Sequence, residues 1–221
     1  MFASLRKFIT RSDPMWRFLH RLSAPGRILE LGCGRGNNCQ VASDIYPDAE
    51  IHGVDLLDNT AVAEVVIYKK LDLDDCILPY PDDFFDAIIL KHVIEHLRYP
   101  WRLGAEINRV MKKGGGIYVE APNWTSILVP SFGFKREQYN PFNFFDDQTH
   151  LRPWTKQALY GFLGQNCKLR VARVGTVRNW LKIPFDLVRL FLGFIKGERQ
   201  PIVLAFWNLY GWCIYAVGVK E

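Results

Sequence analysis

The hydrophobic pattern of the first half of the chain alternates between short apolar runs and segments with helical spacing. It predicts strands at residues 27–32, 50–55, 64–71, 84–91 and 117–121, and helices at residues 38–46 and 100–111. The continuous apolar run at 84–91 is typical of a strand that is buried on both faces. Strands that alternate with helices in this way predict a parallel, doubly wound α/β sheet.

The second half begins with an aromatic, turn-rich segment, residues 123–153, that is too long for an ordinary connection and indicates a lid or a substrate loop. A helix is predicted at 155–166, followed by strands at 168–175 and 212–219. The intervening residues 178–210 are unusually apolar, and their polar positions recur at steps of four, three and seven: Lys182, Asp186, Arg189 and Lys196. We therefore expect a mostly parallel seven-stranded sheet with an apolar helical insert before the last strand.

The amino-terminal residues 1–26 form a basic extension. The sequence Ser12-Asp13-Pro14 combines a polar cap with a proline that suits the first helical position, so a short helix is expected from there to Leu22. Arginines and lysines interrupt the segment every few residues, which does not match a secretory signal peptide. We expect one domain over residues 1–221, with a cofactor-binding half at 27–122 and an acceptor-side half at 123–221.

Composition and charge refine this picture. The chain has 221 residues, of which 49% are hydrophobic, and this excludes a disordered chain. The five cysteines form no C-x-x-C pair, which favours a reducing, cytoplasmic setting. Residues 28–86 carry three basic and thirteen acidic side chains, a net charge of −10, between two basic flanks. The acidic segment predicts that a cation is bound there.

A glycine-rich turn follows the first predicted strand, in the sequence Glu30-Leu31-Gly32-Cys33-Gly34-Arg35-Gly36. Glycines let the backbone pass close to a ligand and adopt positive φ angles. Asp55 lies 21 residues after Gly34, at the end of the next strand, where a carboxylate can accept hydrogen bonds from ribose hydroxyls. The spacing G-x-G-x-G differs from the dinucleotide signature G-x-G-x-x-G. The acidic residue before the glycines would repel a pyrophosphate and would attract a cation such as a sulfonium or an ammonium group.

Together with the later strings LDLDDCILPYPDDFFDAIIL, HVIEHL, RVMKKGGGIYVEAPN and THLRPWT, these motifs resemble class I S-adenosylmethionine-dependent methyltransferases of the type-11/type-23 domain group. The resemblance covers about residues 27–175 and implies the Rossmann-like methyltransferase fold and S-adenosyl-L-methionine as the cofactor. It also implies a set of cofactor-binding residues: Glu30, Gly32, Gly34 and Gly36 for the methionine end, Asp55 for the ribose, Leu56, Asp72 and Leu73 for the adenine, and Lys91 beside the cofactor.

The string His92-Val93-Ile94-Glu95-His96 presents another candidate site. Positions i, i+3 and i+4 share one face of a helix, and H-x-x-E-H is also an inverted zincin signature, which the methyltransferase pattern around it disfavours. Small-RNA 2′-O-methyltransferases place a metal on a similar string with a later histidine. By that resemblance His92, Glu95, His96 and His150 are an alternative metal site, but we expect no metal.

Without a metal, a hydroxyl acceptor needs a base, and His92 and His150 are the candidates because a histidine pKa lies near neutrality. His150 has a second interpretation, in which it braces the long loop together with Thr149. The favoured function is O-methylation of a sugar, glycan or lipid-like small molecule. The alternatives are an N-methyltransferase, which needs no strong base, and a catalytically silent cofactor-binding subunit.

The partners are less defined. The apolar insert at 178–210 is suited to a lid, to a homodimer interface or to peripheral contact with the cytoplasmic face of a membrane. A transmembrane span is disfavoured because residues 201–219 contain a proline and two glycines. A nucleic-acid acceptor is disfavoured because the basic residues are interleaved with aliphatic ones.

Overall fold

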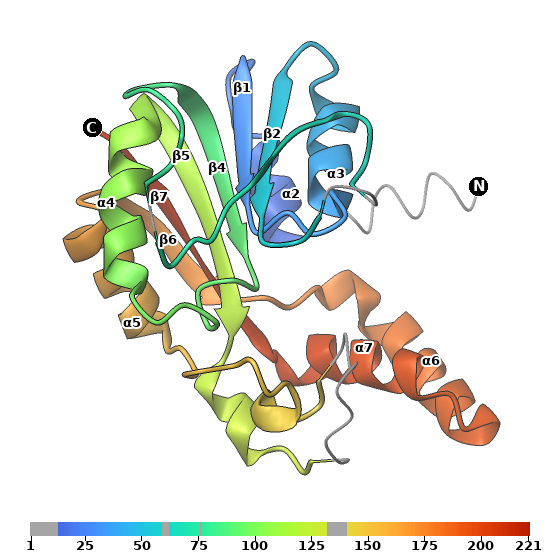
Figure 1. Ribbon diagram of the computed structural model, residues 1–221. Coiled ribbons are helices and arrows are strands. Elements are labelled where there is room, and N and C mark those ends of the chain that lie inside the picture. The colour runs from blue at the N-terminus through green and yellow to red at the C-terminus, as the bar shows by residue number, and fades with distance from the viewer. Residues whose placement is uncertain (1–12, 59–61, 76, 132–140) are drawn as a thin grey trace.

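The computed structural model describes residues 13–58, 62–75, 77–131 and 141–221. Its seven strands form one sheet in the order β3-β2-β1-β4-β5-β7-β6, and only β7 runs antiparallel to its neighbours in the described chain (Figure 1). The strands are β1 (Arg27–Leu31), β2 (Glu50–Asp55), β3 (Val66–Lys70), β4 (Phe85–Lys91), β5 (Met111–Pro122), β6 (Arg170–Thr176) and β7 (Cys213–Val219). The predicted mostly parallel, seven-stranded Rossmann-like sheet is confirmed.

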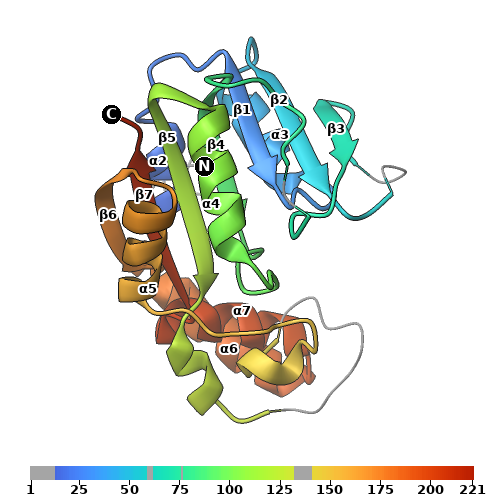
Figure 2. The ribbon, with the colours of Figure 1, turned by 60° about the vertical axis from the view of Figure 1, so that its left-hand side comes forward.

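Helices cover both faces of the sheet, which explains the continuous apolar runs of its central strands. On one face, α4 (Pro100–Val110) and α5 (Lys156–Gly161) contribute to the larger apolar core. On the other, α2 (Pro14–Leu19) and α3 (Asn37–Ile45) enclose a second cluster (Figure 2). The helix predicted from Ser12-Asp13-Pro14 does begin there, because Asp13 Oδ1 accepts from the backbone N–H of Met15 at 2.9 Å.

Three predicted boundaries are wrong. The amino-terminal helix was expected to continue to Leu22, but α2 ends at Leu19. The helix that begins at Pro100 was expected to end at the glycine run 114–116, but α4 ends at Val110 and β5 begins at Met111. The strand bulges at the glycines, since Phe85 of β4 pairs with Met111 whereas Ala87 pairs with Gly116. The helix predicted at 155–166 divides into α5 and a wider turn, η4 (Phe162–Asn166).

The insert predicted at 178–210 is helical and folds back on itself. After the short turn η5 (Trp180–Lys182), α6 (Ile183–Lys196) and α7 (Arg199–Tyr210) pack side by side, with Gly197 at φ +66° in the turn between them. This hairpin lies beyond the carboxyl ends of the parallel strands, beside η2 (Trp124–Leu128) and η3 (Phe144–Asp146) (Figure 2). No helix in the described part of the chain is long and apolar enough to cross a membrane.

Parts of two predicted segments lie outside the described residues. They are residues 1–12 of the amino-terminal extension and residues 132–140 of the long loop.

Candidate functional site

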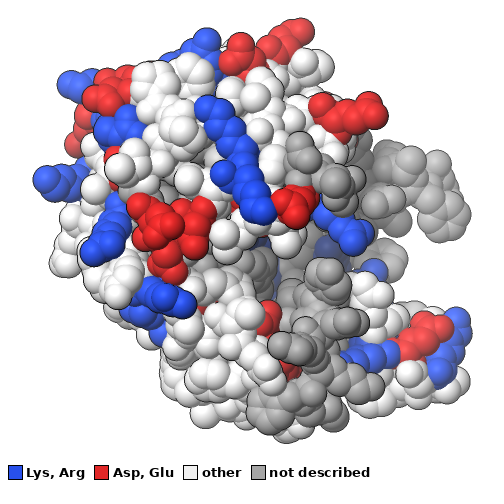
Figure 3. Space-filling model, viewed as in Figure 1, with Lys and Arg blue, Asp and Glu red and all other residues white. Residues whose placement is uncertain are grey.

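A cavity of about 1740 Å³ opens between the carboxyl ends of the parallel strands and the α6–α7 hairpin (Figure 3). Open α/β sheets bind their ligands at this edge. The cavity lining includes seven of the residues predicted from the sequence: Asp55, Leu56, Lys91, His92, Glu95, His96 and His150. The predicted cofactor-binding residues, the predicted histidines and the α6–α7 hairpin therefore line the same cavity.

The glycine turn between β1 and α3 has the backbone expected of a ligand cradle. Gly32, Gly34 and Gly36 have φ angles of +74°, +50° and +80°, in the left-handed region that favours glycine. A Cβ added at Gly32 would lie 2.1 Å from Val93, whereas one at Gly34 would meet no atom within 4 Å. Packing thus excludes a side chain at Gly32, while the space beside Gly34 is open to a ligand.

Asp55 connects this turn to the end of β2. Its Oδ2 accepts from the backbone N–H of Gly34 at 2.7 Å, and its Oδ1 accepts from Leu57 at 3.1 Å. A carboxylate has about four acceptor positions, so two remain for the hydroxyls of a ribose. Leu56 and Leu57 follow, and each is 58% exposed, which leaves apolar surface for the face of a base.

Three other predicted cofactor-binding residues, Glu30, Asp72 and Leu73, are not among the described residues that line the cavity. Glu30 is buried, and its carboxylate accepts from the side chain of Asn38 at 2.6 Å and from the backbone of Cys39 at 3.1 Å. It therefore caps the start of α3, and burial raises its pKa. Asp72 and Leu73 follow β3 and are outside the set of described residues that line the cavity.

A buried charge cluster forms where β4 and β5 end. Glu120 accepts from Tyr118, and its Oε1 lies 3.3 Å from Lys91 Nζ and 3.2 Å from His92 Nε2. Burial opposes ionisation of Glu120, but Lys91 and His92 lower its pKa to about 2. Lys91 is thus paired with Glu120 at the wall of the cavity.

His92 adopts φ +54°, an uncommon conformation for a residue with a side chain, which costs on the order of 1 to 3 kcal/mol and is typical of functional sites. Burial disfavours its imidazolium form, yet Cys213, Glu120 and Glu95 raise the pKa of the ring well above its ordinary value. The two carboxylates beside the ring, Glu120 and Glu95, therefore favour its imidazolium form.

A second cluster, formed by Glu95, His96 and His150, lies on the other side of His92. One ligating atom of each residue lies within 4.8 Å of the others. Glu95 is fully buried, and both of its carboxylate oxygens lack a hydrogen-bond partner among the described residues. Its Oε1 lies 3.4 Å from His92 Nδ1.

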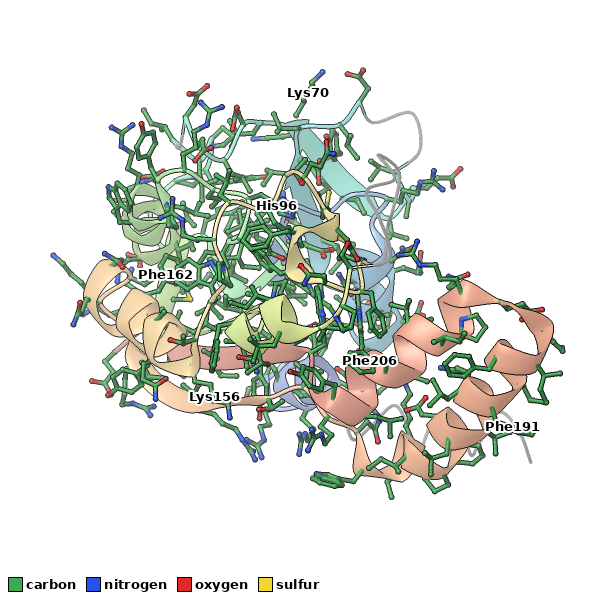
Figure 4. All side chains as sticks on the ribbon, turned by 90° about the horizontal axis from the view of Figure 1, so that it is seen from below. Lys70, His96, Lys156, Phe162, Phe191 and Phe206 are labelled. Carbon is green, nitrogen blue, oxygen red and sulfur yellow. The ribbon has the colours of Figure 1, made fainter. Side chains whose placement is uncertain are left out.

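Neighbouring hydrogen bonds fix the tautomers of both histidines. Thr149 donates its hydroxyl proton to Asp147 at 2.5 Å, so at 2.9 Å it must accept from His96 Nδ1–H. His150 Nδ1–H donates to the carbonyl of Phe144 at 2.6 Å, and burial lowers the pKa of His150. Each ring therefore carries a proton on Nδ1, and in the neutral form of either ring Nε2 carries the lone pair. Figure 4 labels His96.

Several cavity residues were not predicted from the sequence. Glu120 lies two residues before the end of β5, and an acidic residue near the end of a central strand is a signal of the same kind as Asp55. Asp13 lines the cavity as the cap of α2, and burial and then Glu120 raise its pKa. Trp207 of α7 stacks on Trp212 at 4.4 Å between ring centroids and forms an apolar wall that no sequence pattern indicated.

Comparisons with known proteins agree with this architecture. A family model described as a methyltransferase domain matches residues 5–166. A probable S-adenosylmethionine-dependent methyltransferase of Mycolicibacterium smegmatis is 34% identical over 112 residues, which cover 48% of this chain and 42% of that protein. The chain therefore matches less than half the length of this relative.

Two solved structures share the fold over nearly the whole chain. A SAM-dependent methyltransferase from Archaeoglobus fulgidus has a TM-score of 0.63 at 19% identity, covering 98% of this chain and 94% of that one. A putative methyltransferase of Haloferax volcanii, in complex with the activator Trm112, has a TM-score of 0.64 at 14% identity, covering 99% and 93%.

The matched family model spans most of the chain, and the glycine turn, Asp55 and the strand order occupy the positions expected for that fold. The resemblance predicted from the sequence motifs is thereby confirmed, and the chain belongs to the methyltransferase domain family.

Proposed function

We propose that the protein transfers the methyl group of S-adenosylmethionine to a hydroxyl of a sugar, glycan or lipid-like small molecule. The observation that carries the hydroxyl acceptor is His150, which lines the cavity together with Asp55 and Leu56. Its ring is oriented by the Nδ1–H bond to Phe144, and burial lowers its pKa, which favours the neutral form with a lone pair on Nε2. Acceptors with a free amine need no such base, whereas a hydroxyl does.

The cofactor cradle supports the first half of this proposal. The open space at Gly34, the free acceptor positions of Asp55 and the exposed Leu56 fit the amino-acid, ribose and adenine parts of the cofactor in that order. When bound, S-adenosylmethionine supplies a methyl group that is already activated by its sulfonium. The protein then has mainly to orient the acceptor, which accounts for much of the rate of such reactions.

His150 has a defined role in the transfer. The acceptor oxygen forms a bond to the methyl carbon as the carbon–sulfur bond breaks, and the hydroxyl proton passes to His150 Nε2. The imidazolium that results is stabilised by the carboxylates of Glu95 and Asp147, the latter 3.8 Å from Nε2. The apolar side chains of Trp207 and Leu204, which also line the cavity, support an acceptor with apolar surface.

Asp55→Ala tests the cofactor site. The substitution removes the predicted ribose acceptor and the partner of the Gly34 N–H, so we expect the affinity for S-adenosylmethionine to fall by about tenfold or more, since a hydrogen bond to a charged group contributes about 1.5 to 3 kcal/mol. Calorimetric titration measures it. Asp58→Ala, which removes an exposed carboxylate three residues away, is the matched control and should bind as the wild type does. Unchanged affinity of Asp55→Ala would refute the assignment.

The Glu95, His96 and His150 cluster favours a second candidate, in which these residues hold a divalent cation that lowers the pKa of the acceptor hydroxyl. Three acceptor groups converge there, and two histidines whose Nδ1–H groups are anchored are typical of metal ligands.

Metal removal separates the two candidates. If His150 is a base without a metal, we expect turnover to survive dialysis against EDTA, and Co²⁺ to give no absorption band that His96→Ala abolishes. Stoichiometric Co²⁺ binding that is lost in His96→Ala and retained in His20→Ala, an exposed histidine outside the cavity, would instead establish the metal site.

Methyl transfer from labelled cofactor to fractions of a cell extract, with the product identified by mass, addresses the remaining alternatives. An N-methylated product, with turnover insensitive to loss of His92 and His150, would establish the N-methyltransferase. Cofactor binding with no labelled product would favour a silent subunit. We also propose a cytoplasmic setting, consistent with the four described cysteines, which are all free and buried.

A further inference from the structure

Helix α6 exposes a broad apolar surface. We define its outer face as seven residues whose side chains are between 45% and 68% exposed: Phe185, Leu187, Val188, Phe191, Leu192, Phe194 and Ile195. Contiguous apolar surface of this kind on a folded chain marks a site of interaction. Figure 4 shows Phe191 at the outer side of the hairpin, whereas Phe206 of α7 lies toward the body of the protein.

The orientation of α6 is the reverse of that of an ordinary surface helix, which buries its apolar stripe. In α6, Asp186 and Gly193 face inward instead, whereas most of the apolar side chains are exposed. Asp186 is 2% exposed and accepts from Asn208 Nδ2 of α7 at 2.7 Å. Gly193 lies on the same side, where an added Cβ would come within 2.8 Å of Ile202. The contact with α7 thus uses Asp186 and Gly193 and leaves the seven residues of the outer face exposed.

The charges around the outer face indicate what covers it. Between residues 178 and 199 the chain has five basic side chains and two acidic ones: Arg178, Lys182, Arg189, Lys196 and Arg199 against Asp186 and Glu198. Asp186 is buried and is already paired with Arg189 at 3.4 Å. The rim of the face is therefore cationic, which complements anionic lipid headgroups.

A second copy of the chain is a poorer complement, because symmetric packing would bring the same basic rim against itself. Trp180, 68% exposed at the start of the hairpin, is the residue type that prefers the boundary between lipid and water. With 14 residues, α6 is about 21 Å long, too short to cross a bilayer but suited to lie along its surface.

We propose that the outer face of α6 inserts into the surface of a membrane that contains anionic phospholipids. The helix lies parallel to the membrane, with its aromatic and aliphatic side chains among the acyl chains and its basic rim among the headgroups. Lys182 and Trp207 of the same hairpin line the cavity, so docking places the cavity beside the bilayer. Access of an amphiphilic acceptor from the membrane rests on the proposed function; the docking itself does not.

Vesicle flotation tests the docking. The full chain is mixed at low salt with vesicles of phosphatidylcholine and phosphatidylglycerol, or of phosphatidylcholine alone. We expect it to float with the anionic vesicles and at least about tenfold more weakly with the neutral ones, and to be released by high salt. Failure of the folded protein to float with anionic vesicles at low salt would overturn the proposal.

Two double variants locate the contact. Phe191→Ser with Ile195→Ser removes exposed side chains of the outer face and should reduce flotation by about tenfold or more without loss of folding. The matched control, Ile77→Ser with Tyr160→Ser, removes side chains that are 75% and 59% exposed elsewhere and should float as the wild type does. Equal flotation of both variants would contradict the assignment to α6.

Analytical ultracentrifugation tests the alternative that a second copy of the chain covers the outer face. A wild-type dimer that the Phe191 and Ile195 substitutions convert to a monomer, without any flotation, would assign the face to a second copy and overturn membrane docking. Calorimetric binding of S-adenosylmethionine is measured on the same samples. If the wild-type protein binds the cofactor but does not float, only the docking is contradicted; if it floats but does not bind the cofactor, only the proposed function is contradicted.

Discussion

His150→Ala should lower kcat by about 10²- to 10⁴-fold, the range that a general base contributes. The reason is the position of the ring, whose Nδ1–H is anchored on the carbonyl of Phe144 while its Nε2 is left free to accept the proton of the acceptor. The dissociation constant for S-adenosylmethionine should stay near the wild-type value, because His150 belongs to the acceptor side of the cavity. Steady-state turnover of the labelled product and calorimetry measure the two effects.

The pH profile distinguishes this role from a merely structural one. Burial lowers the pKa of His150 below its ordinary 6.5, so the wild-type kcat should be constant at neutral pH and should decline on the acid side, as the base becomes protonated. His150→Ala should lack that decline, and His20→Ala should keep it. Unchanged turnover of His150→Ala at saturating acceptor would remove the residue from the mechanism and leave it the role of bracing the loop.

Glu120→Gln should lower the free energy of unfolding by about 3 kcal/mol or more, the usual effect of removing one partner of a buried ion pair. Glu120 is 2% exposed, and the substitution leaves Lys91 and His92 without their shared counter-ion. Urea denaturation at neutral pH measures the difference. Glu50→Gln removes a carboxylate at the exposed pair with Arg27 and should remain close to the wild type.

The difference between Glu120→Gln and the wild type should depend on pH. The carboxyl has a pKa of about 2 in the folded state, against an ordinary 4.5, so the stability it contributes is present above 4.5 and is lost as the pH falls toward 2. The two proteins should therefore converge in acid. A constant difference across this range, or equal stability at neutral pH, would contradict the ion-pair account.

Much of the fold was predictable because its signals are local. The apolar run at 84–91 and the helical spacing at 100–111 each occur within one element, and both elements are present as β4 and α4. The boundary at the glycine run 114–116 was wrong because glycines usually end a helix, whereas here they permit a bulge in β5 that only the pairing with β4 reveals. A pairing of strands is set by contacts distant in sequence.

In the candidate site, too, some features follow from local sequence patterns and others depend on contacts between residues distant in sequence. The sequence by itself determined the family, the glycine turn and Asp55, because a backbone cradle and the carboxylate after the next strand have fixed spacing in this fold. Only the tertiary structure decided that Lys91 pairs with Glu120 and that α6 turns its apolar face outward. It also decided that the pKa of His92 is raised by its charged neighbours, whereas burial lowers that of His150. Burial and charge neighbours set a protonation state, and helix packing sets the orientation of a face. Both depend on residues that the sequence separates and the fold brings together.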